Sequence, residues 1–383
     1  MKTYLYIFII LLFAQCRERY EPAIKPQETN LLVVQGFINS RGQTQINLSR
    51  TTLLSDSGIA VETGSVVVIE GDDNSVYPLV ESGAGTYLSQ FNTLNSNTNY
   101  RLNIRSSNGK TYLSDWRKEI KTPLIDSITF TRPGNGIEIY VNAKDPENNT
   151  RYYRWNVDED WEIRSEYRTN ATYHLKYTTA PPTFEPEYFF PDTRDFNDSL
   201  YYCWGSRKSS KIIIGNTAKL QEDRIYFPLV KYSQGAVELS VLYSILVKQY
   251  ALSKEGYEFY DKMKKNSENL GTTFDPQPSE LKGNIHCLED EREAVIGFTE
   301  VTTVEERREF ISNQQLPEWN YNSGCQGEIV VPLRNDTLLS AIHYAGRLPT
   351  SYNPGPLGAV IAADKECVDC RLRGTNIKPA FWP

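Results

Sequence analysis

Cysteine is the residue type whose spacing points most directly to chemistry in this chain. Cys367 and Cys370 are separated by two residues, the spacing of a redox pair or of half a zinc site. Zinc would need a second close pair of ligands, and the three histidines (His174, His286 and His343) offer none. A redox pair is expected beside a βαβ pattern, which the sequence lacks. We therefore expect a structural role for Cys367 and Cys370.

The other cysteines raise the question of disulfide bonds. With Cys16 set apart, the cysteines are odd in number: Cys203, Cys287, Cys325, Cys367 and Cys370. Two disulfides and one free thiol would account for all of them, but the sequence alone does not choose among the pairings. We take all five as candidates for disulfide or other structural positions.

Cys16 stands in a different context, close behind a short apolar segment. Lys2 precedes this segment, residues 4–13, which is too short to span a bilayer and is typical of an export signal. Residues 12–15 resemble a lipobox, after which a bacterial lipoprotein carries its acyl chains on cysteine. We expect a signal peptide over residues 1–15, a membrane anchor at Cys16 and an extended tether over residues 16–29. The alternative is an ordinary secretory signal followed by an incidental cysteine.

Aromatic residues make up 12% of the chain, with 25 Tyr and 6 Trp. Many of them fall in a Pro-rich stretch, residues 161–210, which we predict to be a long irregular insertion. Rigid aromatic rings supply contact area at low entropic cost, which suits recognition of a glycan, a peptide or a protein. We take Tyr173, Tyr188, Tyr202 and Trp204 as candidate binding residues. The alternative is that these rings pack the insertion onto the rest of the domain.

The sequence favours binding over catalysis. It contains no G-x-S-x-G, H-E-x-x-H, P-loop or Rossmann glycine pattern, so we expect no enzyme, no catalytic residue and no cofactor. A net charge of −7 argues against nucleic acid as a partner. Acidic residues at 158–162 and at Asp192, Asp195 and Asp198 could supply calcium ligands, but acidic loop residues are usually just solvated. We therefore expect no metal.

The elements that must position these residues are mainly β. The length of 383 residues suggests two or three domains. Residues 30–122 contain about seven short strands at the spacing of an immunoglobulin-like β-sandwich, including a strand at 31–38 and an Asn-Gly turn at 108–109. Residues 123–383 predict a larger β-sandwich domain that carries the insertion. One α-helix is expected at about 253–270, with Ser253 as its N-cap, followed by a strand at 295–298.

Several short motifs, taken in order, resemble the DUF4249 family, a domain of unknown function. They are LSRT at 48–51, GSVVVIE at 64–70, YALSKEGY at 250–257, FDPQP at 274–278, GNI at 283–285, VIGF at 295–298 and CVDCRLRGTN at 367–376. The resemblance implies an envelope lipoprotein of Bacteroidota, often encoded beside a TonB-dependent outer-membrane receptor, with no assigned catalytic residues.

Together these observations predict a non-catalytic outer-membrane lipoprotein. We expect it to be lipid-anchored and surface-exposed, and to assist a TonB-dependent transporter in binding or uptake of a nutrient. One alternative is a structural or adhesive envelope lipoprotein. Another is a hydrolase whose site the sequence does not reveal.

Overall fold

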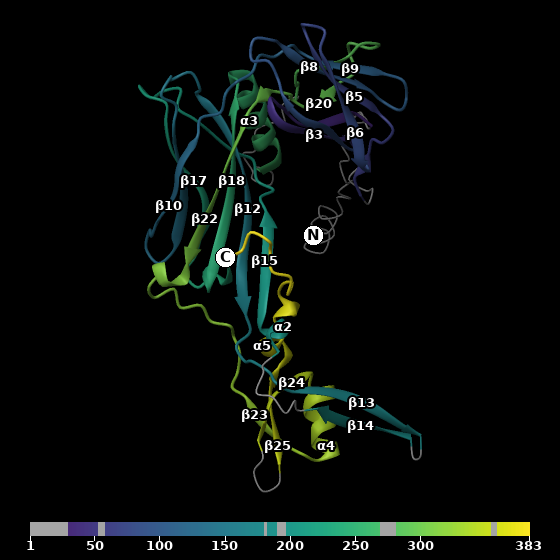
Figure 1. Cartoon of the computed structure of the whole chain (residues 1–383), viewed down its shortest axis with the longest axis vertical. Coiled ribbons are helices and arrows are strands. Elements are labelled where there is room, and N and C mark those ends of the chain that lie inside the picture. Colours follow the sequence, from purple (N-terminus) through teal and green to yellow (C-terminus); the bar gives the residue numbers. More distant parts are fainter. Residues whose placement is uncertain (1–29, 53–57, 180–181, 190–196, 269–280, 354–357) are drawn as a thin grey trace, which may run out of the picture.

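The computed structural model describes residues 30–52, 58–179, 182–189, 197–268, 281–353 and 358–383. Cys16, the predicted signal peptide and the predicted tether lie outside these ranges. The protein is mainly β. It has three parts: a barrel-like sheet, a β-sandwich, and a distal module that contains the described residues within 165–201 and 325–368 (Figure 1). Within the described ranges, no helix has both the length and the apolar character of a membrane span.

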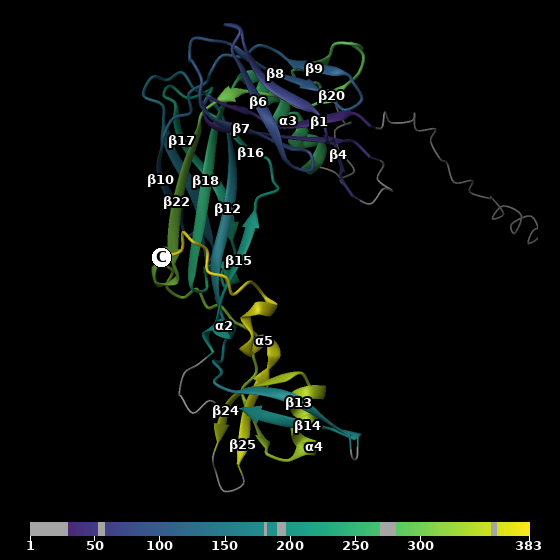
Figure 2. The same cartoon turned by 45° about the vertical axis from the view of Figure 1, so that its right-hand side comes forward.

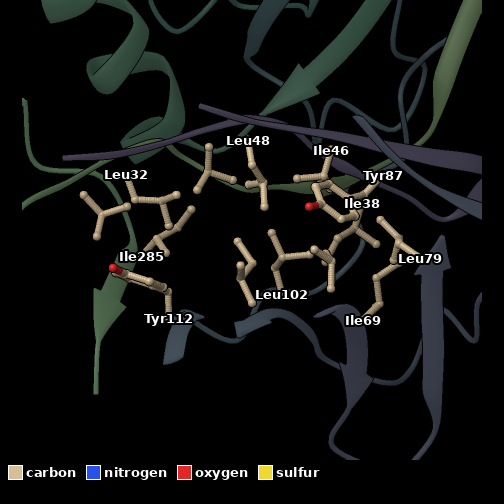
Figure 3. Packing of buried hydrophobic residues seen from close by; sticks show 14 of the residues in the cluster. Leu32, Ile38, Ile46, Leu48, Ile69, Leu79, Tyr87, Leu102, Tyr112 and Ile285 are labelled. Atoms are coloured by element: carbon tan, nitrogen blue, oxygen red, sulfur yellow. The ribbon is translucent and has the colours of Figure 1, made fainter. Parts of the chain in front are cut away.

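A single sheet builds the barrel, and its strands pair in the order β19-β9-β8-β5-β6-β7-β3-β1-β20, with β4 beside β3. The N-terminal region supplies β1 (Leu32–Gly36), β3 (Arg41–Arg50), β4 (Ala60–Val61), β5 (Val66–Gly71), β6 (Val76–Gly83), β7 (Thr86–Thr93), β8 (Tyr100–Arg105) and β9 (Thr111–Ser114). Side chains alternate between the two faces of a strand. The inward ones, such as Leu48, Leu102 and Tyr112, fill the core shown in Figure 3. The sheet is nearly closed, and its immunoglobulin-like character stays a prediction.

Two strands from far along the chain complete this barrel. β19 (Ile285–Cys287) pairs with β9, and β20 (Val295–Ile296) runs parallel to β1, with Leu32 opposite Val295. The short strands β2 (Ile38–Asn39) and β21 (Val301–Thr302) also pair in parallel. A strand near residue 295 is predicted from the sequence, but its membership of the first sheet is not.

The sandwich packs two sheets face to face. One sheet has the order β10-β11-β17 and consists of β10 (Ile125–Thr131), β11 (Ile137–Lys144) and β17 (Arg224–Tyr232). The other has the order β15-β12-β18-β22, with β12 (Tyr152–Arg164), β15 (Tyr202–Lys208), β18 (Leu242–Leu252) and β22 (Val304–Ser312), and β16 (Ile213–Asn216) also pairs with β12. Trp155 of β12 stacks on Phe227 of β17 at 4.8 Å between ring centroids, across the core. The alternate residues of β12, such as Arg154 and Asp158, face away from this core, and we call their side of the sheet the outer face.

The stretch predicted as irregular, residues 161–210, is largely strand, which corrects that expectation. β12 continues to Arg164, a hairpin of β13 (Thr172–Thr179) and β14 (Pro182–Phe189) follows, and α2 (Asp198–Tyr201) leads into β15. The prolines at 182 and 186 misled the sequence interpretation, because proline breaks the interior of most sheets. A two-stranded ribbon tolerates them, since each strand has an edge that needs no ladder hydrogen bond.

The rest of the distal module comes from the C-terminal region. A sheet of order β23-β25-β24 contains β23 (Ile329–Pro332), β24 (Arg347–Asn353) and β25 (Ala359–Asp364). Its short helices are α4 (Asn335–Leu338), η3 (Leu339–Tyr344) and α5 (Lys365–Val368). The other short helices among the described residues are η1 (Val237–Leu239), η2 (Asn313–Gln315) and η4 (Cys370–Leu372). Both views place the distal module beyond the end of the sandwich that is farther from the barrel (Figure 2).

One disulfide joins the sandwich to the segment that follows the distal module, and the other cross-links the distal module itself. Cys203 of β15 bonds Cys370, and Cys325 bonds Cys367. Cys287 is a buried free thiol in β19 of the barrel, and its burial raises its pKa. Cys367 and Cys370 therefore each bond a different partner rather than each other.

The predicted helix is α3 (Lys254–Glu268), which lies between the barrel and the neighbouring end of the sandwich (Figure 1). Ser253 caps it, since its hydroxyl accepts a hydrogen bond from the Gly256 N–H at 3.0 Å. Phe259 of the helix packs 5.7 Å from the Phe298 ring, which links the helix to the segment behind β20. The helix thus helps to hold two of the three parts together.

Candidate functional site

The alternation of β15 brings two of the four predicted aromatics to one face. β15 pairs with β12 in antiparallel register, so that Trp204 lies opposite Glu162 and Tyr202 lies opposite Arg164. Directly opposed residues share a face of the sheet. Cys203, between the two aromatics, points to the other side, where it is buried and bonds Cys370.

The C-terminal segment closes one side of this aromatic face. The backbone N–H of Trp204 donates to the Thr375 carbonyl at 2.7 Å, and the Thr375 N–H donates back to the Trp204 carbonyl at 2.9 Å. Gly374 makes this close approach feasible, because a Cβ there would lie 2.6 Å from the Trp204 carbonyl oxygen. The segment then continues along the sandwich (Figure 1), and Trp382 packs edge-on against Phe310 of β22 at 5.6 Å.

Asp369, one of the two residues between Cys367 and Cys370, anchors the start of this segment. Asp369 is buried, and its carboxylate binds the Arg371 side chain through two contacts of 2.8 Å. These hydrogen bonds hold the pKa of Asp369 below its usual value. The anchored turn positions Cys370 for its disulfide and directs the chain toward Trp204.

Together these elements line an open depression that we call the aromatic cleft. Its volume is about 510 Å³, which is within the usual range for small-ligand sites. The lining combines aromatic rings with groups of both charges: Glu162, Arg164, Asp198, Ser199, Tyr202, Trp204, Leu242, Asn376, Lys378, Trp382 and Pro383. The sheet, helix α2 and the C-terminal segment each contribute to it.

Ion pairs fix the polar side chains around Tyr202. Arg164 Nε lies 2.7 Å from Glu162 Oε1, and the Arg164 guanidinium lies 5.5 Å from the Tyr202 ring. Arg168 Nη2 contacts Asp198 Oδ1 and the Tyr202 hydroxyl, each at 3.0 Å. Two arginines therefore lie next to the Tyr202 side chain at the cleft. Ring faces next to preset donors and acceptors are suited to bind a sugar or a peptide.

The other two predicted residues lie elsewhere. Tyr173 and Tyr188 are opposite each other in the register of the β13–β14 hairpin, which projects from the distal module away from β15 (Figure 1). The four predicted aromatics thus fall in two separate places, and two of the four, Tyr202 and Trp204, lie in the aromatic cleft. Trp382 and Lys378, which line the same cleft, were not predicted. An aromatic pair at 381–382 was their only signal in the sequence.

The acidic clusters considered for calcium are engaged by basic side chains. Asp158 lies 3.4 Å from Lys248, and Asp160 lies 3.2 Å from Arg308. Asp198 is held by Arg168 in the aromatic cleft, whereas Asp192 and Asp195 fall outside the described residues. In the part of the chain that the structure describes, no three His, Cys, Asp or Glu side chains converge as metal ligands.

Comparison with known families decides the wider relationship. A family model described as a domain of unknown function, DUF4249, matches residues 17–308. The chain belongs to the DUF4249 family. Within this DUF4249 protein the match includes the barrel, most of the sandwich and the strand that carries Tyr202 and Trp204. It ends inside β22, so the 367–376 motif, which contributed to the resemblance, lies beyond it. None of the curated proteins compared with the chain matches it.

Proposed function

We propose that this protein is a non-catalytic, lipid-anchored outer-membrane protein that captures a glycan or peptide in the aromatic cleft. In this proposal it assists a TonB-dependent transporter in nutrient uptake. The observation that carries the binding role is the convergence of Tyr202, Trp204 and Trp382 with paired acidic and basic groups in one cleft. The membrane role rests on the apolar segment before Cys16 and on what the family resemblance implies.

A binding role fits the way in which the cleft is assembled. Its walls come from β12, β15 and the C-terminal segment, and the Cys203–Cys370 disulfide lies directly behind it. Groups held by a sheet and a cross-link lose little further freedom when a ligand binds, which favours affinity. The ion pairs of Arg164 and Arg168 preset the polar groups in the same way.

The test is a binding screen of the purified mature protein against panels of neutral oligosaccharides and of peptides, by thermal shift and then calorimetry. For the best binder, Trp204→Ala and Tyr202→Ala should each weaken binding about tenfold or more, as expected for an aromatic contact at the centre of a site. Phe91→Ala, which removes an exposed ring from the barrel, is the matched control and should leave binding unchanged. Equal losses in all three variants, or no binder in either panel, would contradict the proposal.

The transporter role needs a separate measurement. Native-detergent purification of the anchored protein should recover a TonB-dependent receptor in stoichiometric amount. Recovery of the protein alone, from cells that express such a receptor, would leave the binding role standing but would reject the accessory role.

A second candidate is a structural or adhesive envelope protein. The elongated row of modules and the projecting β13–β14 hairpin favour it (Figure 2). Tyr173→Ala and Tyr188→Ala distinguish the two candidates. Loss of cell adhesion in these hairpin variants, with ligand binding intact, would favour the adhesive role.

A further inference from the structure

A second cleft lies at the junction of the barrel and the sandwich, and we call it the junction cleft. Its volume is about 680 Å³. Barrel strands β1 and β3, sandwich strands β12 and β18, and helix α3 all contribute to its lining. These elements come together beneath the barrel in Figure 1. The aromatic cleft uses none of these lining residues, so the two clefts are separate sites on the same sheet.

Arg154 of β12 is the central polar group of the junction cleft. Its guanidinium carbon lies 4.4 Å from the centroid of the Tyr260 ring and 5.9 Å from that of Tyr250. Arg154 donates a long hydrogen bond of 3.4 Å to Asn156 Oδ1. Among the residues that the structure describes, no carboxylate lies within ion-pair distance of Arg154. Two rings therefore orient a guanidinium whose donors are mostly unused by the residues that the structure describes. Such a planar group matches a carboxylate through two parallel hydrogen bonds.

Two lysines add positive charge to the same cleft. Lys248 lies opposite Asn156, and Lys208 lies opposite Asp158, so both share the outer face with Arg154. Lys248 contacts Asp158 at 3.4 Å and Glu306 at 3.9 Å, whereas Lys208 is exposed. The lining thus holds three cationic side chains and one acidic side chain, in a protein whose net charge is −7. A cleft of locally opposite sign concentrates anionic ligands.

The remaining walls supply amides and rings. Gln45 and Asn47 of β3 contribute amide groups, which both donate and accept hydrogen bonds and therefore suit hydroxyl groups. Phe37 of the barrel meets Tyr250 of the sandwich edge-on at 4.9 Å, which gives the cleft an apolar side at the junction itself. A ligand that satisfies all these groups has a carboxylate, several hydroxyls and an apolar ring face.

We propose that the junction cleft binds an acidic sugar, with a uronate carboxylate on Arg154 and hydroxyls on the amides of β3. Lys208 and Lys248 would bind a second uronate of the same oligosaccharide. This site does not depend on the aromatic cleft, so it can stand if the proposed function fails.

The probe is trigalacturonate, titrated into the purified mature protein by calorimetry, with neutral galactotriose as the uncharged counterpart. Trigalacturonate should bind, galactotriose should bind at least about tenfold more weakly, and added salt should weaken only the former. Arg154→Gln should lower trigalacturonate affinity about tenfold or more, because it removes a charge-assisted hydrogen-bond pair. Lys208→Gln should lower it by a smaller factor.

The controls separate charge at this site from charge in general. Arg224→Gln removes an exposed arginine from β17 of the opposite sheet and should leave affinity unchanged. Arg154→Lys, which keeps the charge but loses the planar group, covers the case in which Arg154→Gln does not fold. Absence of trigalacturonate binding, equal binding of galactotriose, or unchanged affinity in the folded Arg154 and Lys208 variants would overturn the proposal.

Discussion

Glu300 shows how one buried carboxyl can make the junction sensitive to pH. Its Oε1 accepts hydrogen bonds from the Ser253 N–H at 2.9 Å and from the Ser253 hydroxyl at 2.6 Å. Its Oε2 is buried and has no hydrogen-bond partner among the described residues. Burial raises the pKa of Glu300 above its usual value of 4.5. The folded protein therefore holds this proton more tightly than the unfolded chain, and the free energy of unfolding falls as the pH rises through the raised pKa.

Glu300→Gln should remove this dependence while it keeps an acceptor for Ser253. We expect the variant to lose less thermal stability than the native protein between about pH 4.5 and pH 7. Melting temperatures across this range measure the effect. Glu258→Gln, an exposed change on the helix α3 that Ser253 caps, serves as the control and should follow the native curve. Parallel curves for Glu300→Gln and the native protein would show that Glu300 does not titrate in this window.

The ion pair of Arg50 and Glu62 gives the unfolding free energy the opposite dependence on pH. Arg50 Nε lies 2.8 Å from Glu62 Oε2, and both side chains are less than a tenth exposed. Although burial opposes it, hydrogen bonds from Arg50 and Ser107 lower the pKa of Glu62. The pair therefore stabilises the barrel above the usual pKa of 4.5, and this stability is lost as the pH falls through the lowered value.

Glu62→Ala should destabilise the protein by about 3–5 kcal/mol, because it leaves the Arg50 charge buried without its counter-charge. Urea unfolding at neutral pH measures this loss. The half-buried pair of Arg101 and Glu70, with 2.7 Å between the charged atoms, provides the comparison, and Glu70→Ala should cost clearly less. Similar losses for the two variants would mean that burial does not set the strength of these pairs.

At the scale of elements, the N-cap of α3 links helix formation to the junction. Ser253→Ala removes the hydroxyl that accepts from the Gly256 N–H and donates to Glu300. The expected cost is about 1 kcal/mol of unfolding free energy, typical of a lost serine cap. Ser267→Ala, at the exposed end of the same helix, should change stability by less than about 0.5 kcal/mol. Urea unfolding of both variants checks the difference.

The helices and strands also show which structural features a local sequence pattern predicts and which it does not. The strand at 31–38 and the start of α3 at its Ser253 cap were predicted, because both signals are local. The β13–β14 hairpin was missed because its prolines imitate a loop. The place of Val295 beside Leu32 was missed because strand pairing over such a separation leaves no local pattern.

The residues of the candidate site also differ in whether a local sequence pattern predicts them. Tyr202 and Trp204 were predicted from composition, and their common face follows from alternation along β15. Trp382 was not predicted, since it reaches the aromatic cleft through the backbone pairing of Trp204 with Thr375. Arg154 was not singled out either, because its role depends on rings from α3 and β18 that meet it only in the folded chain.

At the scale of the whole molecule, we expect the Cys325–Cys367 disulfide to stabilise one part, the distal module. The Cys325–Cys367 bond joins residues 42 apart within the distal module, whose core is a small cluster around Val331, Ile342 and Val360. The double variant Cys325→Ser and Cys367→Ser should lose about 2–4 kcal/mol of stability in this module. Hydrogen exchange should then rise in residues 325–368 and stay unchanged in the barrel. Uniform exchange throughout the molecule would show that the three parts unfold as one unit.

Membrane attachment is the other whole-molecule prediction. Cys16→Ala should move the protein from the membrane fraction to the soluble fraction, because acyl chains on Cys16 are the proposed anchor. Labelling with a fatty-acid analogue should fail in the same variant. A Cys16→Ala protein that still takes the label and still sediments with membranes would reject the lipoprotein assignment, whereas Cys287→Ala should behave as the native protein.

The barrel carries a consequence for how the chain is made. A polypeptide leaves the ribosome N-terminus first, yet β1 and β9 receive their outer neighbours, β20 and β19, only after most of the sandwich has been synthesised. Until then both margins of the nascent barrel expose unpaired backbone groups, which are templates for pairing with other chains. Long-range pairings of this kind also slow folding. The barrel is therefore synthesised first but completed late. A truncated polypeptide that ends before residue 285 would form an open, aggregation-prone sheet in place of a smaller folded protein.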